Sequence, residues 1–536
     1  MPRQSEYKPL LYTTTVRNPE RYKDFIHLLK KFDGQILTAA IVEQFEREAF
    51  KCGLYRPVKR IPESAKQKWG NTSPGDFGEY ALTDEETKAI FDGNDPRIHT
   101  DIAGHKEAGF ERGWESRFET QFKLLKVLGF VYYNMGERIE FSETGNFLAD
   151  TVSITYDDGT VNREIVKPQN EQIAFMQAFA KQQRCNPFIR ELNDNIPLIL
   201  LLQVIRLLNS DSQYNNCGIS YKEIPLLLFW KNNDANALYQ RIKQLREEHG
   251  YSPSPEVIND ICVNEILGGF KAFKQKSVVS EYPDDFVRKM RMTGLISFRG
   301  GGRFIDINHN EDEKIDYIIS TYSHYQKYEE ERSYFDYMAS VDRVLLNIEG
   351  VVVSKNEAAI KLTEWTRVYN WDAIKVELDH LAKRTSSKDD TLKFIDAPSR
   401  LEFLTALAIK TQLPHIEVIP NFPIDDTGLP TSTAGGGIGD IECVEAPNAI
   451  LVEVTMAQGR TQTMMEVWPI ERHLVEFKEK YDVPSQCVFV APSIFNDTVR
   501  QIEFVKFTNK LTIRPYKIDD FVGYLETSRT LYKQTV

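Results

Sequence analysis

Apolar residues recur at the spacing of a helix in the first part of the chain. In residues 22–32 they share one side of a helix, and the same spacing continues through residues 37–52. Residues 53–96 are instead rich in Pro, Gly, Asp and Lys, a composition typical of loops and short helices. The pattern therefore predicts helices joined by longer connections in this region.

Two later segments repeat one order of elements. Each begins with an amphipathic helix that ends at a glycine, Gly129 or Gly294, and continues as a short strand, a tight turn and a return strand. The segments span residues 114–150 and 284–308. This is the order of a winged helix, a motif that often places a helix in the DNA major groove. A helix and hairpin used only for packing or for protein contacts would give the same pattern.

The rest of the chain changes from helical to mixed patterns. Residues 196–208 predict a strongly apolar helix, and residues 312–390 predict further helices. Residues 383–391, KRTSSKDDT, contain no apolar residue and predict a hinge. Strand and helix patterns then alternate to the C-terminus, as in an α/β domain. Within that part, Pro469 is expected to open a second helix after a short one around residues 461–466.

These patterns predict an α+β multidomain protein. A chain of 536 residues is long enough for roughly three to four domains. We expect two N-terminal subdomains, each with one winged-helix element, then a helical linker and a C-terminal α/β domain. The expected boundaries are residues 1–155, 156–310, 311–390 and 391–536.

Composition and charge narrow the function classes. The chain has no run of about 18 apolar residues and its N-terminus lacks the apolar core of a signal peptide, so we expect a cytoplasmic protein without membrane spans. The six cysteines form no CxxC pair, which predicts reduced thiols and argues against structural zinc. The net charge of −12 does not favour nucleic-acid binding, although a local basic face is compatible with a negative total.

Two acidic residues of the C-terminal domain stand in unusual positions. Asp440 lies on or just before a strand predicted over residues 438–444, and Glu453 lies inside the next strand, residues 450–455. A glutamate within an otherwise apolar strand is costly to bury unless a cation compensates its charge. Neighbouring strands of a hairpin would bring both carboxylates close enough to share one Mg²⁺ ion. A solvent-facing glutamate and a turn aspartate would give the same pattern.

The wider sequence resembles a known family of nucleases. The segments LEFLTALAIK, AGGGIGDIE, VEVTMAQGRTQTMMEVWPIERHLVEF and CVFVAPSIF, in this order and spacing, are similar to the AlwI-type family of type IIS restriction endonucleases, which includes a nicking enzyme. The similarity extends more weakly through both wing-like segments and TTTVRNPERY near the N-terminus. It implies an N-terminal DNA-recognition region with winged-helix elements, a helical linker and a C-terminal cleavage domain of the PD-(D/E)xK fold.

The resemblance also implies an active site. Each of the four acidic positions of the family holds an acidic residue here: Glu402, Asp440, Glu453 and Glu466. It implies that Asp440, Glu453 and the Val454 carbonyl bind Mg²⁺, with Glu402 and Glu466 beside them or at a second metal. Magnesium activates water and steadies charge at the scissile phosphate.

Three further positions lie near Glu453 and Glu466 in the sequence. Gln462 and His473 are candidate accessory residues, and His473 would either contact phosphate or pack. The lysine that this fold usually carries beside its catalytic glutamate is replaced by Thr455. Because threonine supplies no charge, the residue that accepts the proton from the attacking water stays open.

A type IIS enzyme would read a short asymmetric site in double-stranded DNA through its N-terminal half. Arginine, lysine and glutamine are suited to reading base edges, and each wing-like segment carries candidates: Arg112, Arg117, Gln121 and Lys123 in the first, and Arg288, Lys289, Arg291 and Arg299 in the second. Solvated helix-face charges or phosphate contacts would give the same residues.

The stoichiometry of cleavage leaves alternatives open. One active site cuts one strand, so double-strand cleavage needs a transient homodimer or a second nuclease subunit. Without such pairing the chain would be a strand-specific nicking enzyme or the large subunit of a heterodimer. A non-catalytic DNA-binding regulator is a further alternative, but the presence of all four carboxylates argues against it.

Overall fold

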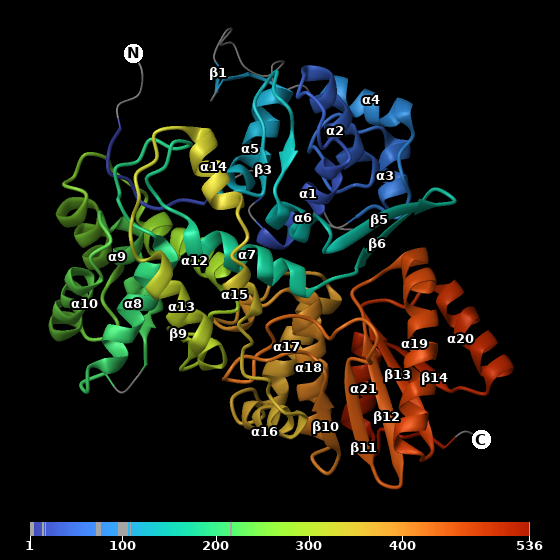
Figure 1. The fold of residues 1–536 in the computed structure, drawn as a ribbon. Coiled ribbons are helices and arrows are strands. Elements are labelled where there is room, and N and C mark those ends of the chain that lie inside the picture. Colours follow the sequence, from blue (N-terminus) through green and yellow to red (C-terminus); the bar gives the residue numbers. More distant parts are fainter. Residues whose placement is uncertain are drawn as a thin grey trace. The chain divides into compact units, whose positions relative to one another are not determined.

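The computed structural model describes residues 5–12, 16, 18–70, 77–94, 106–107, 109–214 and 217–534. The fold mixes helices and sheets, as the sequence predicts (Figure 1). Residues 13–15 and 17 of the TTTVRNPERY segment lie outside the described residues. Among the helices of the described part, none has the length and apolar character needed to cross a membrane.

The chain forms two compact units, each assembled from three stretches of sequence. Unit 1 comprises Met1–Glu46, Asp95–Thr151 and Gln169–Val351, and unit 2 comprises Arg47–Asn94, Val152–Pro168 and Val352–Val536. Two N-terminal stretches therefore fold together with the C-terminal third of the chain. The division into four domains made from the sequence stays a prediction.

Unit 1 is largely helical. Its helices and strands are α1 (Tyr22–Lys30), the first part of α2 (Ala39–Lys51), β1 (Lys106–Glu107), β2 (Phe110–Glu111), α5 (Trp114–Val127), β3 (Val131–Tyr132), β4 (Glu140–Phe141), α6 (Glu143–Ala149), α7 (Gln169–Lys181), α8 (Pro197–Ser210), β7 (Ile219–Ser220), α9 (Ile224–Phe229), α10 (Ala235–His249), α11 (Pro255–Asp260), the π-helical turns η4 (Ile261–Ile266) and η5 (Ser277–Glu281), α12 (Tyr282–Arg291), β8 (Ile296–Arg299), β9 (Phe304–Ile307), α13 (Asp312–Tyr322), α14 (Glu331–Ala339) and α15 (Arg343–Asn347).

Both wing-like segments contain the predicted order of helix, strand, turn and strand. In the first, α5 is followed by the β3–β4 pair, and in the second, α12 is followed by the β8–β9 pair, to which β7 adds a third strand. Gly129 and Gly294 end the two helices with φ of 76° and 74°, a left-handed conformation that glycine adopts without strain.

Unit 2 contains a five-stranded sheet. Its elements are α3 (Glu63–Trp69), α4 (Asp84–Gly93), β5 (Val152–Asp157), β6 (Thr160–Ile165), α16 (Lys355–Trp365), α17 (Trp371–Ala382), α18 (Ala397–Gln412), β10 (Glu417–Pro420), β11 (Ile441–Glu445), β12 (Asn448–Val454), α19 (Gly459–Tyr481), β13 (Ser485–Ala491), α20 (Asn496–Asn509), β14 (Ile513–Lys517) and α21 (Ile518–Thr527). The strands follow the order β10–β11–β12–β13–β14. The first three strands are antiparallel and the last three are parallel.

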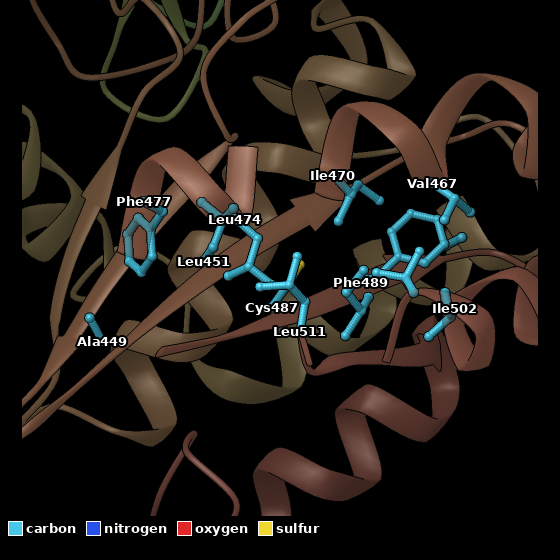
Figure 2. Close-up of a cluster of buried hydrophobic side chains, with 13 residues drawn as sticks. Ala449, Leu451, Val467, Ile470, Leu474, Phe477, Cys487, Phe489, Ile502 and Leu511 are labelled. Carbon is cyan, nitrogen blue, oxygen red and sulfur yellow. The ribbon is translucent and has the colours of Figure 1, made fainter. Parts of the chain in front are cut away.

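Helices cover the sheet on both faces, as expected for parallel strands. One face packs against α19 and α20 through a cluster of buried side chains that includes Leu451, Phe489, Leu474 and Ile502 (Figure 2). Helices α18 and α21 pack against the sheet as well. The α/β character predicted for the C-terminal part of the chain is therefore present, and the sheet provides the rigid frame for the acidic residues.

The helix around Pro469 corrects one expectation. Instead of two helices, a single helix, α19, runs through Pro469 from Gly459 to Tyr481. A proline inside a helix removes one hydrogen bond and costs about 3 kcal/mol. Burial of Val467 and Ile470 on either side of the proline, with Leu474 further along, stabilises the continuous helix against that cost.

Candidate active site

Asp440 and Glu453 face each other at the end of the β11–β12 hairpin. Ile441 pairs with Val452 in the antiparallel register, so the residue before Ile441 lies opposite the residue after Val452. The Val454 N–H donates a hydrogen bond to Asp440 Oδ2 at 2.8 Å. The two carboxyl groups are also close enough to hydrogen-bond to each other. The hairpin therefore brings together the two residues that the sequence pairs.

Gly439 and Asn421 shape the site next to Asp440. A Cβ atom on Gly439 would lie 2.9 Å from Glu453 Oε1 and would overlap the side chain of Leu451. Asn421, just beyond the end of β10, donates from Nδ2 to the Gly439 carbonyl at 2.7 Å and from its N–H to the Asp440 carbonyl at 3.0 Å. No local sequence pattern points to Asn421, because its role depends on the pairing of β10 with β11.

His473 of α19 is the direct partner of Glu453. Its Nδ1 lies 2.9 Å from Glu453 Oε1, and both side chains are 8% exposed. Burial, followed by the charge of Arg472, lowers the pKa of His473. The lowered pKa favours the neutral imidazole, which shares one hydrogen bond with the Glu453 carboxyl group.

The other two acidic residues come from helices. Glu402 of α18 accepts a hydrogen bond from the Ala434 N–H at 2.9 Å, which ties the glycine-rich loop before Asp440 to the site. Glu466 of α19 accepts a hydrogen bond from the Thr455 hydroxyl at 2.5 Å. Thr455 Oγ1 in turn accepts the Ala457 N–H at 3.0 Å. Thr455 therefore holds the Glu466 carboxyl group in place.

The four carboxyl groups form one electrostatic cluster. Burial, followed by the charge of Asp440, raises the pKa of Glu402 well above its usual range, and burial with Glu453 does the same for Asp440. Burial raises the pKa of Glu453 to about 8 and that of Glu466 to about 7. Buried groups of like charge disfavour ionisation. Such a cluster has a deficit of positive charge that a divalent cation would offset.

The donor set suits a hard cation, although each of its carboxyl groups is engaged in hydrogen bonds within the protein. Carboxylate and carbonyl oxygens are the ligands preferred by Mg²⁺. Within the described residues, no three His, Cys, Asp or Glu side chains converge in a preformed metal-holding group. Asp440, Glu453 and Glu402 each bind a protein N–H instead. Small side-chain rotations are therefore part of any metal binding here.

Gln462 has a structural position. Its side chain is fully buried, donates to the Ala457 and Ser493 carbonyls at 3.1 Å and 2.8 Å, and accepts the Phe495 N–H at 2.9 Å. It thereby fastens α19 to the loops that follow β12 and β13. These hydrogen bonds use both the nitrogen and the oxygen of the Gln462 side-chain amide.

A family model described as AlwI restriction endonuclease matches residues 126–368 and 353–524, which together make up most of the chain. The chain belongs to the AlwI restriction endonuclease family. The resemblance read from the sequence motifs is thereby confirmed, and the protein is a site-specific DNA nuclease. No curated protein matches the chain.

Solved structures of restriction enzymes also match this AlwI-family endonuclease. The small subunit (R.BspD6I2) of the heterodimeric restriction endonuclease R.BspD6I is 27% identical over 28% of this chain and 76% of its own, with a TM-score of 0.24. Restriction endonuclease FokI is 10% identical over 96% of both chains, with a TM-score of 0.26. FokI bound to DNA is 12% identical over 98% of this chain and 97% of its own, with a TM-score of 0.24.

The candidate base-reading residues of the first winged segment occupy mixed positions in this AlwI-family endonuclease. Arg112, Arg117 and Lys123 have half-buried side chains. Gln121 is fully buried and lies 3.4 Å from Glu46 Oε2. Gln121 is therefore turned toward the interior of unit 1.

The candidates of the second segment bind within unit 1. Arg288 pairs with Asp284 at 2.8 Å, and the buried Lys289 pairs with Asp285. Two more donate to β-strand acceptors: Arg291 Nη1 to the Ile296 carbonyl at 2.6 Å, and Arg299 Nη1 to Ser297 Oγ at 2.7 Å. The Arg291 bond ties the end of α12 to β8, and the Arg299 bond lies within β8.

Proposed function

We propose that this restriction endonuclease is a Mg²⁺-dependent type IIS enzyme that binds a short asymmetric DNA site and cuts a few base pairs to one side. The observation that carries the proposal is the pair formed by Asp440, just before β11, and the buried Glu453 opposite it on β12, joined by Glu402 and Glu466. Four neighbouring carboxyl groups with raised pKa values, two of them on the buried side chains of Glu402 and Glu453, are costly to ionise together without a cation.

Each residue has a distinct task in this proposal. Asp440, Glu453 and the Val454 carbonyl hold the metal, and Glu402 completes the acidic cluster from α18. When bound, Mg²⁺ activates a water molecule and stabilises charge at the scissile phosphate. His473 shares a hydrogen bond with Glu453 Oε1 and would so orient that carboxyl group when it holds the cation.

Glu466 is the proposed proton acceptor for the attacking water. Its pKa of about 7 places it close to neutrality, where a carboxylate is an effective general base. The Thr455 hydroxyl holds one of its oxygens, and the other oxygen is left for the water. The task usually assigned to lysine is thereby divided between threonine and glutamate.

The test compares Asp440→Asn with Asp482→Asn on plasmid DNA. Asp482 is exposed at the end of α19 in a left-handed conformation that asparagine tolerates, so this variant is a control of equal chemistry. We expect Mg²⁺-dependent cleavage to vanish in Asp440→Asn and to persist in Asp482→Asn. Sequencing the ends gives the site and the offset. Equal cleavage by the two variants would overturn the metal assignment, and scattered ends would overturn the type IIS assignment.

We further propose that each chain cuts one strand at a time. The described residues contain one carboxylate cluster of this kind, and one site hydrolyses one phosphodiester bond. Linear plasmid would then form only through a transient homodimer or a second nuclease subunit. A time course at several enzyme concentrations separates the cases. Linearisation that rises with enzyme concentration indicates a homodimer, and accumulation of nicked circles at every concentration indicates a nicking enzyme or a missing subunit.

A further inference from the structure

The loop between η4 and η5 carries exposed basic residues in an otherwise acidic chain. Its sequence is GGFKAFKQK, residues 268–276, and Lys271, Lys274 and Lys276 are all exposed. The Phe270 ring is 44% exposed beside them. The net charge of the chain is −12, so this run of cations is a local exception. It lies immediately before η5 and α12, the helix of the second winged segment.

The loop is anchored at both ends and at its centre. Gly268 and Gly269 turn the chain after η4 with φ of 76° and 69°, a region that favours glycine. The Phe273 ring packs edge-on against Phe229 of α9, with centroids 5.6 Å apart. Both flanking turns, η4 and η5, are π-helical, a rare conformation that is frequent at functional sites. The lysines therefore project from a fixed frame.

Tyr221 connects this loop to the hairpin of the same segment. Its hydroxyl lies 3.4 Å from the Ser280 carbonyl in η5, and its N–H donates to the Arg303 carbonyl at 2.9 Å. Lys276 precedes Ser280 by about one helical turn, and the exposed Lys222 follows Tyr221 directly. These contacts bring the backbone at Lys222, Lys276 and Arg303 together in unit 1. With Lys271 and Lys274 of the same loop they form a set of five exposed cations that we call the basic edge.

The basic edge differs in its pairing from the cations around it. Arg241, Arg246, Arg288 and Lys289 are each in an ion pair within unit 1. Across the described ranges, none of the five residues of the basic edge is in an ion pair. Two nearby acids are engaged elsewhere: Glu256 accepts from Gln275 at 3.0 Å and Glu281 from Ser277 at 2.7 Å. Clustered like charges repel one another unless an anionic partner covers them.

We propose that the basic edge binds the phosphate backbone of duplex DNA. The inference rests on the proposed function, and it assigns the phosphate contacts of the second winged segment to residues that the sequence did not single out. The adjoining turn, Gly300–Gly302, has three successive glycines at φ of 59°, 65° and 80°, and a Cβ on Gly301 would meet no atom within 4 Å. A backbone without side chains lets the duplex approach closely beside Arg303. Phosphate contacts of this kind position the protein and carry no sequence information.

The test measures binding of the full chain to a short duplex in EDTA over a series of salt concentrations. The variant K271Q/K274Q/K276Q keeps the aliphatic stems and removes three charges. Each lost phosphate contact reduces the slope of log K against log salt by about one. We expect a slope shallower by about three, equally for duplexes with and without the cleavage site.

Two further variants keep the result interpretable. The control K31Q/K327Q/R343Q removes three exposed charges from other elements of unit 1 and is expected to leave the slope unchanged. The variant K222Q/R303Q changes the basic edge from a different pair of elements and is expected to lower the slope by about two. Equal slopes for the wild type and the loop variant would overturn the proposal that the basic edge binds DNA. An equal loss of slope in the control variant would overturn it as well.

The readout separates this inference from the proposed function. A wild-type chain that cleaves DNA while the loop variant retains the full slope refutes the basic edge and leaves the nuclease assignment intact. A wild-type chain that does not cleave DNA, but whose slope becomes shallower by about three in the loop variant, supports the basic edge and refutes the proposed function. Thermal unfolding of each variant, unchanged from wild type, shows that a lost slope comes from lost charge.

Discussion

The Thr455 hydroxyl donates a hydrogen bond to Glu466 Oε1 at 2.5 Å, and through it the end of β12 is linked to α19. Because the same hydroxyl accepts the Ala457 N–H, the loop between the strand and the helix is held by one side chain. A lysine at this position would supply charge to the attacking water. The Thr455 hydroxyl instead orients the Glu466 carboxyl group, so residues from the end of the strand and from α19 act together.

Replacing Thr455 with valine tests this relationship. Valine keeps the shape and removes the hydroxyl, so we expect cleavage to fall roughly tenfold to hundredfold, the usual loss for a residue that orients a catalytic group. Because the Thr455 hydrogen bond lowers the pKa of Glu466, its loss raises that pKa. The rise of kcat/KM with pH then moves to higher pH. Thr455→Ser restores both rate and profile. An unchanged profile in Thr455→Val would show that Glu466 does not accept the proton.

Gly439→Ala tests how closely Glu453 is packed. A Cβ there would lie 2.9 Å from Glu453 Oε1, so the carboxylate must turn away from Asp440. We expect a large loss of cleavage together with a loss of stability, because the buried Leu451 side chain must move as well as the Glu453 carboxyl group. The control is Gly523→Ala on α21, where a Cβ meets no atom within 4 Å. Wild-type activity in Gly439→Ala would mean that the position of Glu453 is not critical.

Magnesium affinity should depend on pH. Burial raises the pKa of Glu453 to about 8 and that of Glu466 to about 7, and protons compete with the cation for these oxygens. As pH falls below about 8, the Mg²⁺ concentration for half-maximal cleavage should therefore rise, by up to about tenfold per pH unit for each proton released. Titrations with Mg²⁺ at pH 6.5, 7.5 and 8.5 measure it. A half-maximal concentration independent of pH contradicts the expectation.

The arrangement of the candidate site is partly predictable from the sequence. Asp440 and Glu453 are joined by a short hairpin, so strand alternation alone places them side by side. Glu402 and His473 reach the same place from two helices, which no local pattern encodes, and they were found only through the family resemblance. Pro469 misled the interpretation because proline usually ends a helix, whereas burial of its neighbours outweighs that tendency here.

The basic residues show a different limit of sequence reasoning. Asp284 and Asp285 stand four positions before Arg288 and Lys289, a spacing typical of a solvated helix face. In the structure the Asp285–Lys289 pair is directed into unit 1, because the helix packs on the side that carries Lys289, whereas the Arg288 and Asp284 side chains remain 30% and 33% exposed. Which face of a charged helix is buried depends on its neighbours, and these lie far away in the sequence.

Lys289→Met provides the contrast with the basic edge. The Lys289 side chain is fully buried, pairs with Asp285 and lies 5.4 Å from the centre of the Tyr12 ring. Methionine has a similar shape and leaves Asp285 unpaired, so we expect a loss of about 1–3 kcal/mol in the free energy of unfolding, measured by chemical denaturation. The slope of DNA binding against salt should not change, since no phosphate contact is removed. Lys276→Gln should do the reverse, with unchanged stability and a slope shallower by about one. A Lys289→Met protein of full stability and reduced slope would place Lys289 on the DNA and return the recognition surface to α12.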